Sequence, residues 1–164
     1  MEALECIFTK REIREFKAKE VPEHIIFKIL EAGRLAGSAK NRQPWDFILI
    51  KDKRRLYELS NFGRYAQHMR EAYFAIVIVR SNDYVHDPFD AGRAAQNMML
   101  AAHALGVGSC PITLHDEEKA KKYLGVPEEK RIQVCLDFGY PLAIKRKGKV
   151  IRKPLEQILH SEKW

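Results

Sequence analysis

Cysteine is scarce in this chain of 164 residues, and its three copies stand far apart in the sequence. Cys6, Cys110 and Cys135 form no CxxC pair, and an odd number cannot pair completely. The spacing therefore argues against both a disulfide framework and a cysteine-rich zinc site. We expect three reduced thiols whose role is packing rather than catalysis.

Long apolar runs are also absent. The longest, AYFAIVIV over residues 72–79, is far shorter than the roughly 20 residues that a membrane-spanning helix needs. The opening MEALECIFTKRE lacks the charged-then-apolar order of a signal peptide. We therefore expect a cytoplasmic protein with no membrane partner.

The familiar catalytic signatures are missing as well. The chain has no HExxH, Walker loop or GxGxxG, and GVGSC has too few glycines at the wrong spacing. No Ser/His/Asp arrangement can be recognised. The acids Glu31 and Asp137 stand alone. Five of the six histidines are scattered without metal-ligand spacing, which predicts surface or packing roles for them: His68, His86, His103, His115 and His160. Chemistry without a protein nucleophile usually belongs to a cofactor.

Positive charge is in excess. The formal net charge is +7 and the pI is near 9.3, which indicates an anionic partner: nucleic acid, a membrane surface or a phosphorylated cofactor. The run KRKGKVIRK keeps a basic nucleic-acid-binding module open as one interpretation. Against it, no aromatic residues are interleaved with the run, and the apolar helix described below would have no function there. We therefore expect no nucleic-acid partner.

The length and the 46% of hydrophobic residues fit a single domain, residues 1–164. Strands are predicted at 46–52, 72–81 and 131–141; because residues 72–79 are apolar on both faces, this strand should be central in a sheet covered on both sides. Helices are predicted at 2–9, 22–36, 51–61 and 116–125, with a turn and a short helix after Asn61. The order indicates a layered α/β or α+β domain.

One further helix organises the rest of the chain. Between Gly92 and Ile112 the only charge is Arg93, and Ala, Met and Leu fill nearly every face. Such a helix belongs in a core or in a subunit interface. Asp90 is the predicted N-cap and Gly106 the predicted stop, and GVGSCP is predicted to be a loop whose backbone can approach something flat.

The tail over residues 145–164 combines a basic run with an apolar one. After KRKGKVIRK comes PLEQILHSEKW, which carries Leu155, Ile158, Leu159 and Trp164. A disordered tail rarely contains such residues. We expect a second subunit to cover this face.

Four polar clusters remain: KREIR at 10–14, SAKNRQPW at 38–45, GVGSCPIT at 106–113 and VIRKP at 150–154. Together they offer cations from both ends of the chain, amide and hydroxyl groups from its middle, and N–H groups from a loop. This set suits a flat heterocycle that carries a phosphate.

These clusters resemble the motifs of the nitroreductase family of FMN flavoproteins, over nearly the whole chain. KREIREF resembles the family's RRSxRxF, GSAKNRQPW resembles PSxxNxQPW, and AAQNMMLAAHALGVGSC resembles AAQNxxLAAxALGLGSC. GYP at Gly139 and RKPLEQ at Arg152 resemble the closing motifs GYP and RKPLEE. The chain departs from the pattern at three places: Glu12 replaces a serine, Gly37 a proline and Pro111 a frequent tryptophan.

The resemblance implies an FMN site without metal or catalytic side chain, since the flavin N5 carries the chemistry. Arg14 would lie near the N1 and O2 edge of the ring, and Lys10 and Arg11 near the phosphate or ribityl chain. Arg152 resembles a C-terminal phosphate contact.

Two further segments would contact the ring. In the family, one subunit lays the loop that matches Ser38, Ala39 and Asn41 against the isoalloxazine of its partner. The segment facing ring N5 matches Pro111, Ile112, Thr113 and Leu114. The residues alone leave other interpretations open: Arg14 as a surface ion pair, Ser38 as a turn residue and Gln43 as a loop-stabilising amide.

The implied fold is α+β, a mixed sheet flanked by helices, in an intertwined homodimer whose C-terminal tails are exchanged. The implied activity is NAD(P)H-dependent oxidoreduction through FMN, by a ping-pong mechanism, with a small acceptor such as a nitroaromatic, a quinone or a flavin. The alternatives are a specialised flavoprotein of the dehalogenase or flavin-fragmenting type and a flavin carrier without turnover. No ribose-phosphate fingerprint indicates NADH or NADPH, and the insertion that covers the pocket of larger members is missing.

Overall fold

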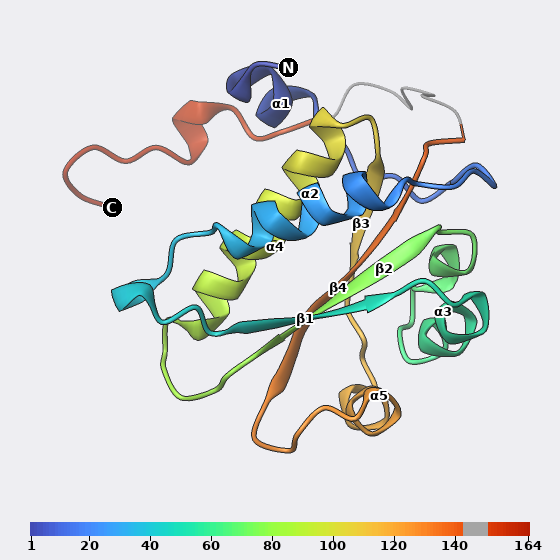
Figure 1. The fold of residues 1–164 in the computed structure, drawn as a ribbon. Helices are drawn as coiled ribbons and strands as arrows, with labels where there is room; N and C mark the ends of the chain where they lie inside the picture. The colour runs from blue at the N-terminus through green and yellow to red at the C-terminus, as the bar shows by residue number, and fades with distance from the viewer. Residues whose placement is uncertain (143–150) are drawn as a thin grey trace.

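The computed structural model describes residues 1–142 and 151–164 (Figure 1). A four-stranded sheet with the order β1-β2-β4-β3 forms its centre. The strands are β1 (Trp45–Ile50), β2 (Phe74–Arg80), β3 (Gly108–Ile112) and β4 (Arg131–Gly139). All three strand pairs are antiparallel, and the parallel component of the expected mixed sheet is, within the described ranges, the single bridge between Glu12 and Ser109.

Helices cover both faces of this sheet. The α-helices are α1 (Ala3–Thr9), α2 (Glu23–Arg34), α3 (Lys53–Ser60), α4 (Asp87–Ala104) and α5 (Glu117–Leu124), and the 3-10 turns are η1 (Ala39–Asn41), η2 (Gln67–Arg70) and η3 (Leu155–Gln157). In Figure 1, α2 and α4 lie on one side of the sheet and α3 and α5 on the other. In the described ranges, no helix combines the length and apolar character that a bilayer crossing requires.

Strand β2 is central, as its composition predicts. Its residues alternate between two buried clusters: Phe74, Ile76 and Ile78 pack with α2 and α4, while Ala75 and Val77 pack with α3, η2 and α5. β-branched and aromatic side chains suit a strand that is covered on both faces. This prediction is confirmed.

Helix α4 is buried along much of its length, again as predicted, but it begins earlier. It starts at Asp87, with Pro88 in its first turn, where the missing N–H costs nothing. Asp90 is therefore not the N-cap, and its carboxylate binds a neighbouring loop instead. Helix α2 crosses α4 closely at Gly33, where any side chain would collide with Met98.

The predicted GVGSCP loop is wrong in its second half, because Gly108–Ile112 forms strand β3 and pairs with β4. Pro111 fits there because β3 is an edge strand, so proline's missing N–H removes no bond to β4. All three cysteines, Cys6, Cys110 and Cys135, are buried free thiols.

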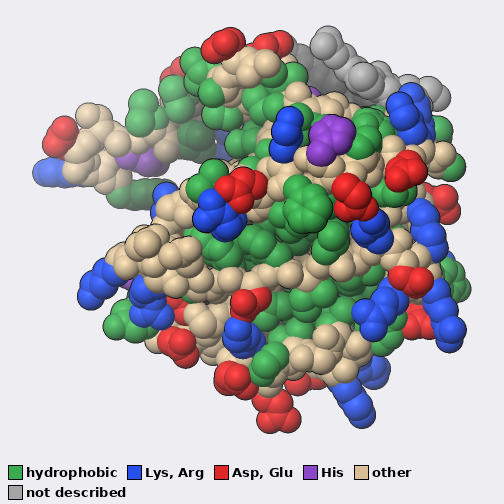
Figure 2. Space-filling view, in the orientation of Figure 1, with side chains coloured by type: hydrophobic (Ala, Val, Ile, Leu, Met, Phe, Trp, Pro, Cys, Tyr) green, Lys and Arg blue, Asp and Glu red, His purple; other side chains and the backbone are tan. Residues whose placement is uncertain are grey.

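The tail described over residues 151–164 stands off the body of the molecule as an arm (Figures 1 and 2). Every residue in it is exposed, including Ile151, Leu155, Ile158, Leu159 and Trp164. Residues 145–150 of the predicted tail lie outside the described residues. The arm thus presents a row of apolar side chains that the rest of the described chain leaves uncovered.

Candidate functional site

The basic segment after α1 runs beside the edge strand β3. The Ile13 N–H donates to the Ser109 carbonyl at 3.0 Å, and Glu12 bridges to Ser109. Gly108 permits this approach, because a Cβ there would lie 2.8 Å from the Cβ of Ile13. Two predicted clusters, Lys10–Arg14 and Gly106–Thr113, are therefore adjacent in the fold.

The three N-terminal cations differ in what they contact. Lys10 is nearly buried; its Nζ donates to Glu12 Oε1 at 2.6 Å and lies 3.5 Å from the sulfur of Met99. Arg11 donates to the carbonyls of Phe8 and Lys10, which closes the end of α1. Arg14 is exposed and has no hydrogen-bond or ion-pair partner among the described residues. Of the three, Arg14 is the cation most available to an anion.

The local potential here is positive. Burial lowers the pKa of His103, and the charges of Lys10 and Arg11 lower it further. The same histidine lies 2.9 Å from the Thr9 hydroxyl, so it fixes the end of α1 on α4. A phosphate would be favoured at this place, although Glu12 adds one negative charge beside Lys10.

The segment from Pro111 to Leu114 alternates between exposed and buried positions. Pro111 and Thr113 face solvent, whereas Ile112 and Leu114 are buried in the cluster beneath the sheet. Gly63 packs so closely on the Thr113 carbonyl that a Cβ would lie 2.8 Å from it. The two inward side chains anchor the segment, and the two outward residues are available to a ligand.

The loop of residues 38–43 has an unusual backbone. Lys40, Asn41 and Gln43 adopt φ values of 52°, 54° and 51°, the left-handed region that non-glycine residues rarely enter. The Ser38 hydroxyl accepts the Gln43 N–H at 2.9 Å, and the Gln43 amide donates to the Asn41 carbonyl. Both side chains thus stabilise the loop, in agreement with the turn and loop-stabilising interpretations of Ser38 and Gln43.

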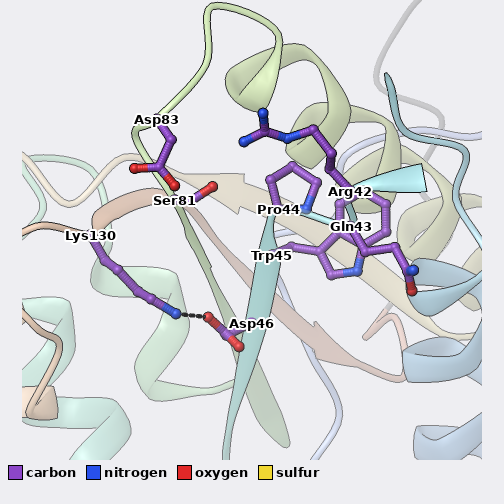
Figure 3. A pocket seen from close by; sticks show the side chains of 8 residues that line it. All are labelled: Arg42, Gln43, Pro44, Trp45, Asp46, Ser81, Asp83 and Lys130. Carbon is purple, nitrogen blue, oxygen red and sulfur yellow. Dashed lines mark hydrogen bonds and ion pairs between the residues drawn. The ribbon is translucent and has the colours of Figure 1, made fainter. Parts of the chain in front are cut away.

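A shallow polar pocket of about 260 Å³ lies where this loop enters β1 (Figure 3). Arg42 and Gln43 line it from the loop, Asp83 lies on the opposite side, and Lys130 pairs with Asp46 below. No N-terminal cation contributes to its lining. The pocket is therefore separate from the cluster that Lys10 and Arg14 form.

Helix α4 holds the predicted site residues apart within one chain. The loop contacts α4 at Asp90, and the N-terminal segment contacts it at Met99. Nine helical residues at about 1.5 Å each separate these contacts by roughly 14 Å. Figure 1 likewise shows η1 and α1 near opposite ends of α4. Arg152 lies in the exposed tail, where its guanidinium contacts only the carbonyl of Ile151 among the described residues.

A buried ionisable pair lies on the sheet face covered by η2. His68 Nδ1 is 2.6 Å from Asp137 Oδ2, and Asp137 is fully buried with its Oδ1 unpaired within the described part of the chain. Burial raises the pKa of Asp137, and the His68 hydrogen bond opposes that shift. The sequence predicted no carboxylate partner for Asp137 and a surface or packing role for His68, and it did not indicate that the two residues contact each other. The alternation in β4, which places Asp137 on the same face as the buried Cys135, indicated only that its side chain points inward.

Other titratable groups nearby offer no nucleophile. Burial raises the pKa of the Cys110 thiol to about 12, and the Asp137 charge adds to the shift. The thiol is therefore protonated at neutral pH. The described residues also contain no cluster of three His, Cys, Asp or Glu side chains that could hold a metal ion.

Comparison with known proteins shows which family the chain resembles. The model of the nitroreductase family matches residues 7–63 and 61–140. A provisionally named NADH dehydrogenase/NAD(P)H nitroreductase of Archaeoglobus fulgidus is 33% identical, and the match covers 99% of each chain.

Solved structures share the fold over almost the full length. An FMN-dependent nitroreductase of Clostridium difficile R20291 has a TM-score of 0.87 at 28% identity, covering 98% of this chain and 99% of that one. A provisionally named nitroreductase of Desulfovibrio desulfuricans, solved in complex with FMN, has a TM-score of 0.86 at 31% identity, covering 98% and 96%.

Proposed function

This chain belongs to the nitroreductase family, and from that premise we propose that it is an FMN-dependent oxidoreductase that uses NAD(P)H. The observation that carries the proposal is the adjacency of the Lys10–Arg14 segment and β3, which places cations beside the strand that carries the exposed Pro111. A provisionally named relative that is 31% identical was solved in complex with FMN. Bound FMN would supply the hydride chemistry at N5, for which no protein nucleophile is needed.

The chain's own residues would bind and orient the flavin. Arg14, which has no partner among the described residues, would place a positive charge at the edge of the ring where the reduced flavin becomes anionic. Lys10 and Arg11, together with Arg152, would contact the phosphate and ribityl chain. Pro111 and Thr113 would face the ring, while Ile112 and Leu114 keep the segment in place through their buried side chains.

Glu12 would compete with a bound phosphate for the ammonium group of Lys10. Its Nζ pairs with Glu12 at 2.6 Å, so a phosphate would have to share Lys10 with a carboxylate. Among the described residues, Glu12 pairs with Lys10 rather than with Arg11 or Arg152. Arg14 therefore contributes more to flavin retention than its neighbours.

A complete site would be formed between two copies of the chain. The loop with Ser38, Ala39 and Asn41 lies roughly 14 Å along α4 from the cations, so one copy's loop would meet the flavin held by the other. The apolar side chains of the exposed arm would bury themselves on the partner. We infer an intertwined homodimer in the cytoplasm, with the tail of residues 151–164 wrapped around the neighbouring subunit.

Turnover would follow a ping-pong order. NAD(P)H would occupy the exposed face of the ring first, and after it leaves a small acceptor would take the same place. A nitroaromatic, a quinone or a free flavin would fit such an open site.

The visible absorption spectrum tests this proposal. Wild-type protein should purify yellow or bind added FMN, and it should bleach when NADH or NADPH is added without oxygen. Arg14→Ala should retain less FMN and oxidise NAD(P)H more slowly, whereas Arg54→Ala, which removes an exposed arginine on α3, should match wild type. Protein that binds FMN but never bleaches would be a flavin carrier. Equal FMN occupancy in the Arg14→Ala and Arg54→Ala variants would show that Arg14 is not part of the flavin site.

A further inference from the structure

The loop of residues 38–43 needs an external restraint. Its three left-handed non-glycine residues, Lys40, Asn41 and Gln43, occupy a conformation that the isolated backbone disfavours. Hydrogen bonds inside the loop, such as Gln43 N–H to Ser38 Oγ, close it locally but do not fasten it to the body of the protein. The contacts that fasten it come from α4.

Asp90 on α4 provides the first contact. Its Oδ2 accepts the Ala39 N–H at 2.8 Å, and the residue is only 3% exposed. A bond from a backbone N–H to a buried carboxylate is stronger than one between neutral groups. Asp90 therefore fixes the loop at the residue that begins η1.

Arg93 supports the same contact from one helical turn further on. Its guanidinium lies 3.7 Å from Asp90 Oδ1 and packs on the backbone at Gly37. Arg93 and Asp90 thus contact each other and the start of the loop.

The other end of the loop is held by the first turn of α4. Arg42 lies 3.8 Å from Asp87 and stacks on the Tyr84 ring at 3.5 Å. Asp87 is itself fixed by the Ser81 hydroxyl and by two backbone N–H groups. Two acidic residues on one helix thus fasten both ends of a strained loop.

We propose that Asp90 is a positioning residue for flavin binding: it holds the Ser38–Gln43 loop in the shape with which the loop contacts a flavin bound to the partner subunit. This inference rests on the proposed function. Its physical basis is preorganisation, since a loop already held in its bound shape loses less entropy when the flavin arrives.

The test compares three variants by FMN affinity, by the visible flavin spectrum and by trypsin cleavage after Lys40 or Arg42 in the absence of FMN. Asp90→Ala should weaken FMN binding about tenfold or more, because small displacements at such contacts are costly, and should shift the flavin spectrum and speed loop cleavage. Asp90→Asn keeps an oxygen acceptor and should restore most of the affinity.

Asp52→Ala is the matched control, because it removes a similar 2.8 Å bond from a carboxylate to a backbone N–H at the start of α3. It should lower thermal stability yet leave FMN affinity, spectrum and loop cleavage at wild-type values. Asp90→Ala with wild-type affinity and cleavage would overturn the inference, as would an equal loss in Asp52→Ala. Wild-type protein without FMN affinity would instead overturn the proposed function, and with it the flavin-facing role.

Discussion

The His68–Asp137 pair allows a quantitative test of how the sheet tolerates a buried charge. Asp137 is fully buried and the His68 side chain is 11% exposed, so solvent can reach the carboxylate on neither oxygen. His68→Leu keeps much of the packing volume but removes the one hydrogen-bonding side chain that contacts the carboxylate among the described residues. Such a loss typically costs about 3–5 kcal/mol of unfolding free energy.

The cost should depend on pH. Burial already raises the pKa of Asp137, and His68→Leu removes the hydrogen bond that works against that rise. The folded variant then binds a proton more tightly than the unfolded chain, whose aspartate has a pKa of about 3.9. Its stability therefore falls as pH rises through the folded pKa, and the deficit relative to wild type should be larger at pH 8 than at pH 5.

Urea unfolding followed by far-UV circular dichroism, at one fixed protein concentration, would measure these differences. Asp137→Val should cost less than His68→Leu, because it leaves behind a partly exposed imidazole rather than a buried carboxylate. The double variant should recover roughly 2–3 kcal/mol relative to the sum of the single effects. Strictly additive effects, or a His68→Leu variant within about 0.5 kcal/mol of wild type at pH 8, would refute the reasoning.

Two other substitutions test the neighbourhood of the cations. Gly108→Ala should destabilise the fold by about 1–3 kcal/mol, because the new methyl group meets Ile13; the cost in thermal unfolding should shrink in an Ile13→Ala background, and an unchanged cost would exclude that contact as its cause. Glu12→Gln should release Lys10 and tighten FMN about three- to fivefold, as expected of a partly exposed ion pair, while riboflavin affinity should stay the same. Equal gains for both flavins would mean that Glu12 does not act on the phosphate.

Local signals predicted most of the helices and the central strand. The run Phe74–Val79 is unambiguous because its side chains suit a covered strand, and α5 follows its capping residues: Asp116 accepts the Lys119 N–H, and Gly125 ends the helix at φ 70°. Each of these features depends on residues close in sequence. They could therefore be recognised before any tertiary contact was known.

The features that could not be predicted depend on distant partners. Strand β3 contains Gly108 and Pro111 and follows Gly106, residues that are typical of loops. It nevertheless forms a strand because its backbone groups pair with those of β4. Asp90 reads as a helix cap in the sequence, but its partner Ala39 lies 51 residues earlier. His68 and Asp137 are 69 residues apart. No local pattern specifies which of many polar residues will meet in this way.

The same distinction, between what the sequence predicts and what depends on distant contacts, applies to the candidate site. The motif resemblance assigned the Lys10–Arg14 segment and the segment Pro111–Leu114 to one flavin site, and the structure places the first segment beside Ser109 of β3. The contacts of these residues with a flavin stay predictions. The resemblance did not reveal that Glu12 already engages Lys10 or that Asp90 and Arg93 hold the loop. Those contacts are side-chain details of this chain, which a shared motif does not encode.

The separation of the loop from the cations along α4 has a genetic consequence if the site is shared between subunits. A chain with a defective Arg14 still carries a sound loop, and a chain with a defective Asp90 still carries sound cations. A mixed dimer of these two variants would then contain one site in which both the cations and the loop come from unaltered segments. Random pairing of equal amounts would restore about one quarter of the sites in a two-fold symmetric dimer, so two mutant alleles that each abolish activity would complement one another.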